Sequence, residues 1–355
     1  MDVDIPAEFT ERDWERNVTG DPVRFAVVGL GWFGPDVAIP AIEASDYCVT
    51  TVCVSGDKEK AARVAAENDA EHGLTYEEYA DGAAVEAYDA VYVVTPNAVH
   101  LPHVETAAEH GKDVLCEKPL EATAERARRC VTVCADAGVE LMTAYRMHAT
   151  RSVRYVRGLV ADGVIGDPVH TRGAFSNNLI AAGESMDQWR LDPDLAGGGP
   201  LMDLGVYPLN TSRLVLNADP TAVHASTVEG PPAFDGLEKY CAFTMEFPGG
   251  PVATCDTGYE VASDDYFEVG GTHGRIRIDD PFNVDADRRL TVRADGEETV
   301  VEVEEPSEMV EEFDYFATGL RSDMDIGPDG EHGAFDVEVT EAIYESAETG
   351  ARVEI

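Results

Sequence analysis

The sequence predicts two domains, an α/β domain with a doubly wound parallel sheet followed by an α+β domain with an open, mainly antiparallel sheet. Between residues 24 and 144, short β-branched runs alternate with amphipathic helical runs, which is typical of a parallel sheet covered by helices on both faces. A glycine-rich turn directly follows the first run, and from residue 222 onward strand-like runs are separated only by turn residues. We expect the domains at residues 23–148 and 149–355, after an acidic N-terminal extension, residues 1–22.

Each element follows from its local pattern. In the first domain we expect strands at 24–28, 49–54, 90–94, 114–116 and 141–144, and helices at 35–44, 58–67, 102–110 and 123–137. Gly138 ends the last of these helices. In the second domain we expect helices at 152–162 and from about 204, then strands at 240–247, 252–259, 266–269, 275–278, 289–293 and 299–303. Two closing helices at 309–320 and 337–349 should pack back on the body.

Acidic residues outnumber basic ones along the whole chain. The 355 residues include 69 Asp and Glu against 26 Lys and Arg, a formal net charge of −43. Nucleic acid and anionic membranes would repel such a chain, so we expect neither as a partner. Because the acid is spread between periodic apolar segments, we interpret it as halophilic adaptation. In concentrated salt the Debye length falls to about 3 Å at 1 M, so self-repulsion costs little.

The composition also indicates a cytoplasmic protein without a metal site. The seven cysteines lie mostly in apolar runs, and no second Cys or His pair joins Cys130 and Cys134 to complete a metal-binding pattern. We expect buried free thiols in a reducing compartment. The N-terminus has neither an apolar core nor a twin arginine, so we expect no export signal, and no run reaches the ~20 apolar residues that span a bilayer.

The glycine-rich turn has the pattern of a dinucleotide-binding loop. Gly29, Gly31 and Gly34 form a GxGxxG motif that follows the first strand and opens a helix. The first glycine permits the tight turn, the second lets the backbone approach a pyrophosphate, and the third lets the helix pack closely. The alternative is an ordinary glycine-rich turn. The strand–turn–helix context favours a Rossmann domain.

The end of the second strand favours NADP over NAD. NAD enzymes usually place Asp or Glu there to bind the ribose 2′-hydroxyl, whereas this strand ends in the neutral Ser55. Lys58 and Lys60 follow at once, two of only five lysines in the chain, and they suit a 2′-phosphate. Two alternatives stay open: Asp57 could serve an NAD site, and both lysines could point to solvent from a helix start.

Three further clusters carry polar chemistry. The third and fourth strands lead into Thr95-Pro-Asn97-Ala-Val-His100 and Cys116-Glu117-Lys118-Pro119, at carboxyl ends where doubly wound sheets bind ligands. Lys118 needs a partner or a function there, unless its side chain extends to solvent. In the second domain, Asp203 and Tyr207 lie one helical turn apart and can bind an alcohol and take its proton. The alternative is an acidic residue near an ordinary helix start.

Six segments in this order resemble the Gfo/Idh/MocA oxidoreductases: GLGWFG (29–34), TPNAVH (95–100), CEKP (116–119), YRMH (145–148), QWRL (188–191) and LAGGGPLMDLGVYPLN (195–210). The resemblance covers nearly the whole chain from residue 23. It implies an NADP-dependent dehydrogenase that oxidises an aldopyranose, with D-xylose the substrate we expect, at C1 to the aldonolactone by hydride transfer to nicotinamide. NAD is the alternative cofactor.

The resemblance also implies roles for individual residues. Tyr207 would be the general base, the ammonium group of Lys118 would favour its phenolate, and Asp203 would accept hydrogen bonds from sugar hydroxyls. The implied catalytic residues are Lys118, Asp203 and Tyr207, and the implied substrate-binding residues are these three with His148. The implied cofactor-binding residues are Gly29, Gly31, Trp32, Phe33, Gly34, Ser55, Lys60, Thr95, Asn97, His100, Glu117, Lys118, Arg146, Trp189 and Arg190.

Several alternatives stay open at this point. D-glucose, inositol or a trans-dihydrodiol could replace D-xylose, and residues 176–186 are the segment most suited to selecting among them. A different class of protein, a non-catalytic NADP-binding redox regulator, would need the glycine-rich loop but not Lys118, Asp203 and Tyr207 together. We expect a small-molecule sugar as the partner, and a homodimer or homotetramer formed through the C-terminal sheet.

Overall fold

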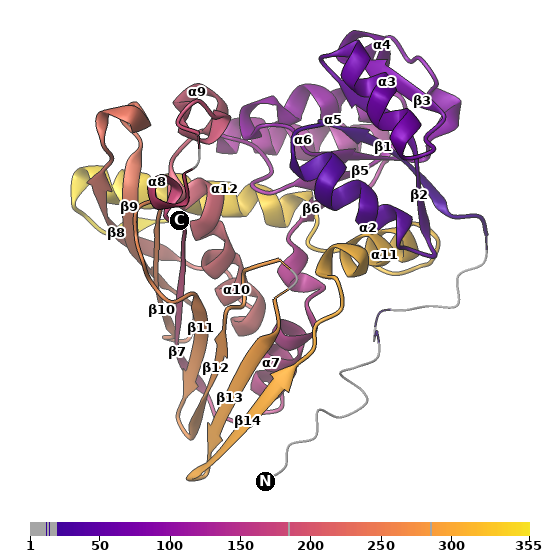
Figure 1. Cartoon of the computed structure of the whole chain (residues 1–355). Helices are drawn as coiled ribbons and strands as arrows, with labels where there is room; N and C mark the ends of the chain where they lie inside the picture. Colours follow the sequence, from indigo (N-terminus) through magenta and orange to yellow (C-terminus); the bar gives the residue numbers. More distant parts are fainter. Residues whose placement is uncertain (1–11, 13, 15–19, 184, 285) are drawn as a thin grey trace. The chain divides into compact units, whose positions relative to one another are not determined.

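The computed structural model describes residue 12, residue 14 and residues 20–355 apart from 184 and 285 (Figure 1). It divides into two compact units, each described by itself below. The parallel-sheet unit comprises Trp14–Arg146 and Met309–Val337, and the mixed-sheet unit comprises Met147–Glu308 and Glu338–Ile355 together with residue 12. The domain boundaries expected from the sequence, at 22/23 and 148/149, stay a prediction.

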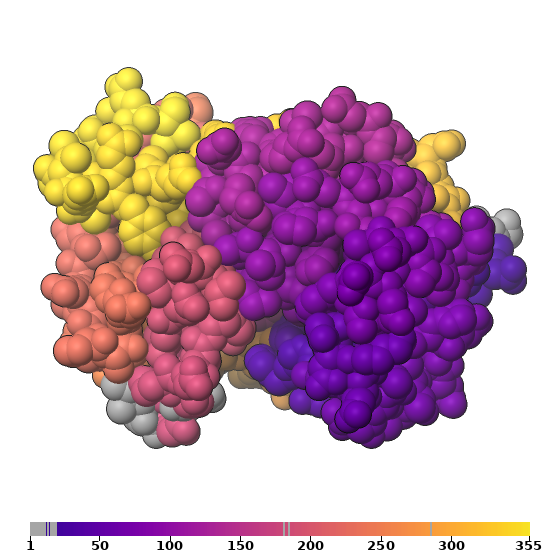
Figure 2. Space-filling view, turned by 90° about the horizontal axis from the view of Figure 1, so that it is seen from above, coloured from indigo at the N-terminus to yellow at the C-terminus, as the bar shows by residue number. Residues whose placement is uncertain are grey.

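The parallel-sheet unit contains a six-stranded sheet with the order β3-β2-β1-β4-β5-β6, and every pair in it is parallel. The strands are β1 (Val23–Val28), β2 (Cys48–Ser55), β3 (His72–Thr75), β4 (Ala90–Val93), β5 (Asp113–Glu117) and β6 (Leu141–Ala144). The doubly wound sheet expected from the sequence is therefore confirmed. In Figure 2, residues 23–145 (indigo to purple) form one continuous surface.

Helices connect these strands and cover both faces of the sheet. They are η1 (Gly34–Ala38), α2 (Ile39–Glu43), α3 (Lys58–Glu67), α4 (Tyr76–Ala80), η2 (Val85–Ala87), η3 (Asn97–Val99), α5 (His100–Glu109) and α6 (Ala124–Ala137). The short helix η4 (Arg146–His148) contains the boundary between the two units. Two separate clusters of buried apolar side chains lie on the two faces, which explains why the strands read as continuous apolar runs. Helix α11 (Glu308–Leu320) adds Phe313 and Phe316 to one of them.

Local chemistry explains where these helices begin and end. Thr123 accepts a hydrogen bond from the backbone N–H of Arg126 at the start of α6, and Gly138 ends α6 in the left-handed conformation with φ of 69°. Strand β3 and helix α4 did not appear in the sequence-based prediction, because each is short and β3 begins with His72 and Gly73 rather than with β-branched residues.

The mixed-sheet unit contains nine strands in the order β14-β13-β12-β11-β7-β10-β9-β8-β15. They are β7 (Pro168–Ser176), β8 (Ala222–Glu229), β9 (Glu238–Glu246), β10 (Val252–Gly258), β11 (Tyr266–Gly271), β12 (Gly274–Asp279), β13 (Arg288–Ala294), β14 (Glu297–Val303) and β15 (Val353–Glu354). Only β7 and β10 pair in parallel, so the expected mainly antiparallel sheet is confirmed. Strand β7, which the sequence pattern did not reveal, lies in the interior of the sheet.

Helix α10 places the second polar cluster against this sheet. The helices of the unit are α7 (Arg151–Ala161), α8 (Leu179–Ala182), η5 (Trp189–Leu191), α9 (Pro193–Ala196), η6 (Leu201–Gly205), α10 (Val206–Leu216), η7 (Pro232–Phe234) and the later part of α12 (Gly330–Thr349). A Cβ atom on Gly173 of β7 would lie 2.6 Å from the Pro208 Cβ, so this glycine permits the close approach of α10 to the sheet. Helix α12 begins at Gly330, earlier than the expected residue 337.

Candidate active site

The glycine-rich loop lies at the carboxyl end of β1 and meets the neighbouring strands. The Gly29 N–H donates to the Val54 carbonyl at 3.0 Å, and a Cβ at Gly29 would lie 2.6 Å from the Val94 carbonyl oxygen. A Cβ at Gly34 would lie 2.5 Å from the Gly29 carbonyl oxygen. Gly29 has φ of 111°, which side chains other than glycine rarely adopt. Close backbone packing therefore requires the first and third glycines of the motif.

The second glycine has a different environment. A Cβ at Gly31 would meet no described atom within 4 Å, so this backbone faces open space. The adjoining helix begins at Gly34 without a side-chain cap, with Pro35 in its first turn. Uncapped backbone amides beside an open glycine are the features that accept a pyrophosphate. Trp32 is 58% exposed, and its ring lies edge-on to that of Phe33 at 5.3 Å.

Two of the polar residues that follow β2, Asp57 and Lys58, bind other parts of the chain. The Asp57 carboxylate caps α3, accepting hydrogen bonds from the backbone N–H groups of Glu59 at 2.9 Å and Lys60 at 3.1 Å. The Lys58 Nζ donates to the Gly73 carbonyl at 3.0 Å and forms an ion pair with Glu78. The Asp57 carboxylate and the Lys58 ammonium group therefore already have partners within the protein.

Ser55 and Lys60 have hydrogen-bond donors that can bind a ligand beside the end of β2. The Ser55 Oγ accepts a hydrogen bond from the Asp57 N–H at 3.2 Å, which leaves its hydroxyl proton to donate elsewhere. Lys60 is half-buried, and its ammonium group has no ion-pair partner in the described part of the chain. Of the two lysines singled out in the sequence, Lys60 is the one able to contact a ligand here.

The loops after β4 and β5 are joined to each other. His100 is fully buried, with Nε2 at 2.8 Å from the Thr95 carbonyl oxygen and Nδ1 at 3.1 Å from the Leu120 carbonyl oxygen. The Thr95 Oγ1 is buried and has no hydrogen-bond partner among the described residues. Such an orphaned hydroxyl directly after a strand end is a candidate contact for a ligand. His100 thus holds the two loops together, while the Thr95 hydroxyl remains unsatisfied among the described residues.

The CEKP segment follows β5 directly. The Glu117 carboxylate accepts a hydrogen bond from the buried Tyr92 phenol and another from the Lys118 backbone N–H at 3.2 Å. Burial, followed by the charge of Glu117, raises the pKa of Tyr92 well above its usual value, so this phenol stays protonated. Lys118 is half-buried, the Lys118–Pro119 peptide bond is cis, and Asn97 on the neighbouring loop is buried.

One supporting ion pair was not identified in the sequence. Glu121 is fully buried, forms an ion pair with Arg126 at 2.7 Å and accepts a hydrogen bond from the Leu101 N–H at 3.3 Å. Arg126 also donates to the Ala98 carbonyl at 2.9 Å. This ion pair therefore ties the start of α6 to the same loops, and five-residue spacing of unlike charges is too common a signal to reveal it.

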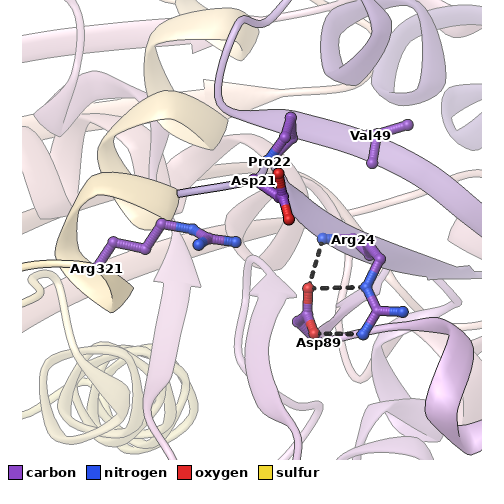
Figure 3. A pocket seen from close by; sticks show the side chains of 6 residues that line it. All are labelled: Asp21, Pro22, Arg24, Val49, Asp89 and Arg321. Carbon is purple, nitrogen blue, oxygen red and sulfur yellow. Dashed lines mark hydrogen bonds and ion pairs between the residues drawn. The ribbon is translucent and has the colours of Figure 1, made fainter. Parts of the chain in front are cut away.

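A pocket of about 610 Å³ lies at the other end of β1 (Figure 3). It is lined by Asp21, Pro22, Arg24, Val49, Asp89 and Arg321. Arg24 forms an ion pair with Asp89 at 2.7 Å. Parallel sheets of this kind bind dinucleotides at the carboxyl ends of their strands, whereas this pocket lies at the amino end of β1. We therefore do not assign it to the cofactor.

In the mixed-sheet unit, Asp203 and Tyr207 lie on η6 and the first turn of α10. The Asp203 Oδ2 accepts hydrogen bonds from the Arg190 Nε at 3.2 Å and from the Tyr259 phenol at 3.0 Å. The Arg190 guanidinium also lies over the Trp189 ring, 4.7 Å from its centroid. Of the residues expected from the sequence, Arg190 therefore contacts Asp203 directly and Trp189 contacts Arg190. Tyr259, which lacked any motif, also contacts Asp203.

Aromatic packing holds Tyr207. Its ring lies edge-on to Phe175 at 5.3 Å and tilted against Phe282 at 5.8 Å, and the residue is only 8% exposed. Arg288, fully buried, donates to the carbonyls of Pro281 and Asn283 and so fixes the loop that carries Phe282. Nearby on the same helix, Asn210 Oδ1 lies 3.0 Å from His148 Nε2.

The glycine run before Asp203 is explained by a buried carboxylate. Glu238 accepts hydrogen bonds from the backbone N–H groups of Gly199 and Leu201, both at 3.1 Å, and from the Tyr344 phenol at 2.9 Å. A Cβ on Gly199 would lie 2.6 Å from the Glu238 carbonyl oxygen, and one on Gly198 would lie 2.2 Å from the Tyr344 hydroxyl. Glu238 thus anchors the start of η6, the element that presents Asp203.

The described residues contain no group of three or more His, Cys, Asp or Glu arranged to hold a metal ion. Among the described helices, none combines the length and the apolar character needed to cross a bilayer. All seven cysteines are free and buried.

Both units match known domains. Residues 23–145 match the oxidoreductase family with an NAD-binding Rossmann fold, and residues 153–277 match the GFO/IDH/MocA C-terminal domain. The chain belongs to the Gfo/Idh/MocA oxidoreductase family. The resemblance seen in the sequence motifs is therefore confirmed, and with it the assignment of the chain as an oxidoreductase with a nicotinamide dinucleotide-binding domain.

Two full-length Gfo/Idh/MocA relatives come from salt-loving archaea. A D-xylose 1-dehydrogenase [NADP(+)] of Haloarcula marismortui is 45% identical, and the alignment covers 100% of both chains. A D-xylose 1-dehydrogenase (NADP(+)) of Haloferax volcanii is 33% identical over 93% of this chain and 99% of its own length.

Solved structures of family members share the fold. The aldose–aldose oxidoreductase from Caulobacter crescentus, complexed with glycerol, aligns with a TM-score of 0.88 and 28% identity, covering 94% of this chain and 100% of that one. Levoglucosan dehydrogenase aligns with a TM-score of 0.80 and 20% identity over 94% of this chain and 99% of that one, a likeness of fold alone.

Proposed function

We propose that this chain is an NADP-dependent D-xylose 1-dehydrogenase, which oxidises the C1 hydroxyl of the pyranose to give the aldonolactone. The observation that carries the proposal is that Asp203 and Tyr207 lie four residues apart, on η6 and the first turn of α10, in a chain 45% identical throughout to the Haloarcula enzyme. A redox regulator without catalysis would not need this pair.

The residues of the parallel-sheet unit fit NADP. Gly31 leaves open space for a pyrophosphate, and the orphaned Thr95 hydroxyl needs a partner that the described chain does not supply. Ser55 and Lys60 hold the 2′-phosphate, because Asp57 is engaged as a helix cap and Lys58 is paired with Glu78. When bound, the cofactor supplies the acceptor for the hydrogen and electron pair that leave C1 of the sugar.

Other residues are proposed as cofactor contacts. Asn97 and Glu117 follow strand ends, and His100 acts through the loops that it joins. Gly29 and Gly34 shape the loop, and Trp32 and Phe33 lie beside it. From the sequence motifs, Arg146, Trp189 and Arg190 are also proposed to contact the cofactor.

Tyr207 is the general base in this proposal. The other tyrosine near Asp203 is unsuited to the task, because burial, followed by the charge of Asp203, raises the pKa of Tyr259 well above its usual value. Tyr259 therefore keeps its proton and donates it to Asp203. Tyr207 takes the proton of the C1 hydroxyl, and the family motif assigns Lys118 the role of favouring its phenolate.

Asp203 and His148 bind the sugar. A carboxylate accepts hydrogen bonds from sugar hydroxyls, and Arg190 and Tyr259 donate hydrogen bonds to the Asp203 carboxylate. Because an amide oxygen accepts, the hydrogen bond with Asn210 Oδ1 places a proton on His148 Nε2 and fixes the orientation of the ring. Residues 176–186 remain our proposed selector among aldoses.

The test is the initial rate of NADPH formation in molar KCl, with D-xylose against D-glucose and NADP against NAD. We expect a strong preference for D-xylose and NADP. Faster turnover of D-glucose would reassign the substrate within the same chemistry. Absence of reduction with every aldose would contradict sugar oxidation, and inositol and trans-dihydrodiols would be tested next.

We also propose that the enzyme is a cytoplasmic, salt-adapted homodimer or homotetramer that assembles through the mixed sheet. Val228, Val252 and Val300 lie on three strands of that sheet and are 37–48% exposed, which favours a covered face. Analytical ultracentrifugation in molar KCl tests the assembly. A Val228→Glu, Val252→Glu double variant should shift it to the monomer, and a monomeric wild-type protein would contradict the proposal.

A further inference from the structure

Tyr259 occupies a position from which it can control the orientation of Asp203. It follows β10 directly and is 1% exposed. Its backbone is held on both sides, because its N–H donates to the Lys239 carbonyl and its own carbonyl accepts from the Leu179 N–H, each at 2.9 Å. Its ring lies edge-on to Phe234 at 6.1 Å. The phenol is therefore a donor fixed in space.

Asp203, in contrast, needs help to hold one orientation. The terminal torsion of an aspartate is broad, so a partly exposed carboxylate rotates unless donors fix it. The Asp203 side chain is 17% exposed, and Oδ2 receives both the Tyr259 phenol and the Arg190 Nε. The two donors come from different elements, the end of β10 and η5, and converge on one oxygen.

The two donors differ in rigidity. The Arg190 side chain is 23% exposed and belongs to a three-residue helix, η5. Tyr259 is enclosed by the sheet and has only two side-chain torsions. Because a hydrogen bond to an ionised group is among the stronger ones in proteins, loss of the fixed donor should release the carboxylate.

We infer that Tyr259 is a positioning residue of the sugar site, whose buried phenol, together with Arg190, holds Asp203 in the orientation that accepts hydrogen bonds from the sugar. Tyr259 acts on the substrate only through Asp203. The inference rests on the proposed function, because it takes Asp203 as the residue that binds the sugar.

The first test is the Tyr259→Phe variant, which keeps the ring and removes the donor. We expect KM for D-xylose to rise about tenfold with kcat changed by no more than about twofold, the pattern of a lost ground-state contact, while KM for NADP stays constant. A uniform fall in activity with KM for D-xylose unchanged would overturn the inference.

Tyr240→Phe is the matched control. It removes a phenol in the same sheet that also hydrogen-bonds a carboxylate, but the carboxylate is Asp256 of β10 rather than Asp203. We expect this variant to keep the wild-type KM for D-xylose. An equal rise of KM in both variants would mean that any lost phenol in this sheet disturbs sugar binding, and that result would also overturn the inference.

A double-mutant cycle tests whether the effect passes through Asp203. In an Asp203→Asn background, adding Tyr259→Phe should change kcat/KM by less than about twofold, because two residues that act through one another are not additive. Full additivity of the two changes would show that Tyr259 acts independently and would contradict the inference.

Crystal structures separate this inference from the proposed function. In wild-type crystals we expect one rotamer for Asp203, and in Tyr259→Phe crystals a rotated or split carboxylate with the ring of residue 259 in place. An unchanged Asp203 in the variant would overturn the inference even if D-xylose is the substrate. Failure of the wild type to oxidise any aldose would refute the proposed function alone, and the rotamer comparison would still decide the role of Tyr259.

Discussion

The Asp57 carboxylate accepts a hydrogen bond of 3.1 Å from the backbone N–H of Lys60 at the first turn of α3. An acidic residue that could have marked an NAD site is thereby used to cap a helix. The side chains that remain beside the end of β2 are Ser55 and Lys60, both suited to an anionic 2′-phosphate.

Cofactor preference should therefore respond to these two residues. The double change Ser55→Asp, Lys60→Ala places a carboxylate where the phosphate would bind and removes the ammonium group. We expect the NADP/NAD ratio of kcat/KM to fall at least about tenfold, the effect of roughly 1.4 kcal/mol. Lys58→Ala is the control, because Lys58 is engaged with Glu78 and Gly73, and it should keep the wild-type ratio. An unchanged ratio in the double variant would refute this placement of the phosphate.

Removal of the Tyr207 hydroxyl should stop proton transfer without disturbing the cofactor. In Tyr207→Phe the ring keeps its contacts with Phe175 and Phe282, so the fold should be retained. We expect kcat to fall about 10²–10⁴-fold, the usual contribution of a general base. NADPH affinity, measured by fluorescence titration, should stay at the wild-type value. Near-normal turnover would assign the base to another residue.

One histidine should make stability depend on pH. Burial, followed by the charge of His100, lowers the pKa of His103 from 6.5 to about 4. The unfolded chain therefore takes up a proton at a pH where the folded chain does not. The contribution of the neutral His103 to the free energy of unfolding should be complete above pH 6.5 and should be lost as the pH falls toward 4.

Urea unfolding of His103→Phe at several pH values checks this expectation. The phenyl ring can keep the stacking that His103 makes with Tyr76 at 4.7 Å, but it does not titrate. We expect a flatter dependence of stability on pH in this interval. His224→Gln, at an exposed position on β8, should leave the wild-type slope unchanged. Identical slopes for wild type and His103→Phe would refute the assignment.

Salt should stabilise the fold strongly. With a net charge of −43, the acidic side chains repel one another in dilute buffer. Molar salt shortens the Debye length to about 3 Å and so screens this repulsion. We expect Tm to fall on transfer from molar to millimolar KCl. Repeating the measurement with NaCl in place of KCl at the same concentrations separates screening, which both salts provide, from specific binding of potassium. A Tm independent of salt would contradict the halophilic interpretation.

Most of the parallel-sheet unit could be predicted from the sequence, because its information is local. Alternating apolar runs, Thr123 and Gly138 at the ends of α6, and the glycine motif each report on neighbours within a few residues. Strand β3 and helix α4 escaped because four or five residues carry little periodicity. Strand β7 escaped because polar and small residues interrupt its pattern, PVHTRGAFS.

The candidate site likewise contains residues that the sequence revealed and residues that only the structure revealed. The spacing of Asp203 and Tyr207 on one helix could be read directly, as could the cluster at Trp189 and Arg190. Glu238 and Tyr344 could not, because a buried carboxylate that binds the backbone of a distant loop leaves no motif of its own. The roles of Asp57 and Lys58 likewise needed the hydrogen bonds of the folded chain.

The sequence by itself determined five of the six parallel strands, the glycine-rich loop, the family and the spacing of Asp203 and Tyr207, since each depends on residues close together in the chain. Only the tertiary structure decided that Tyr259, 56 residues after Asp203, donates to its carboxylate. It also decided that Met309–Val337 joins the parallel-sheet unit. Such contacts depend on how a sheet orders its strands and on which surfaces become buried together, and no local pattern of residues encodes either.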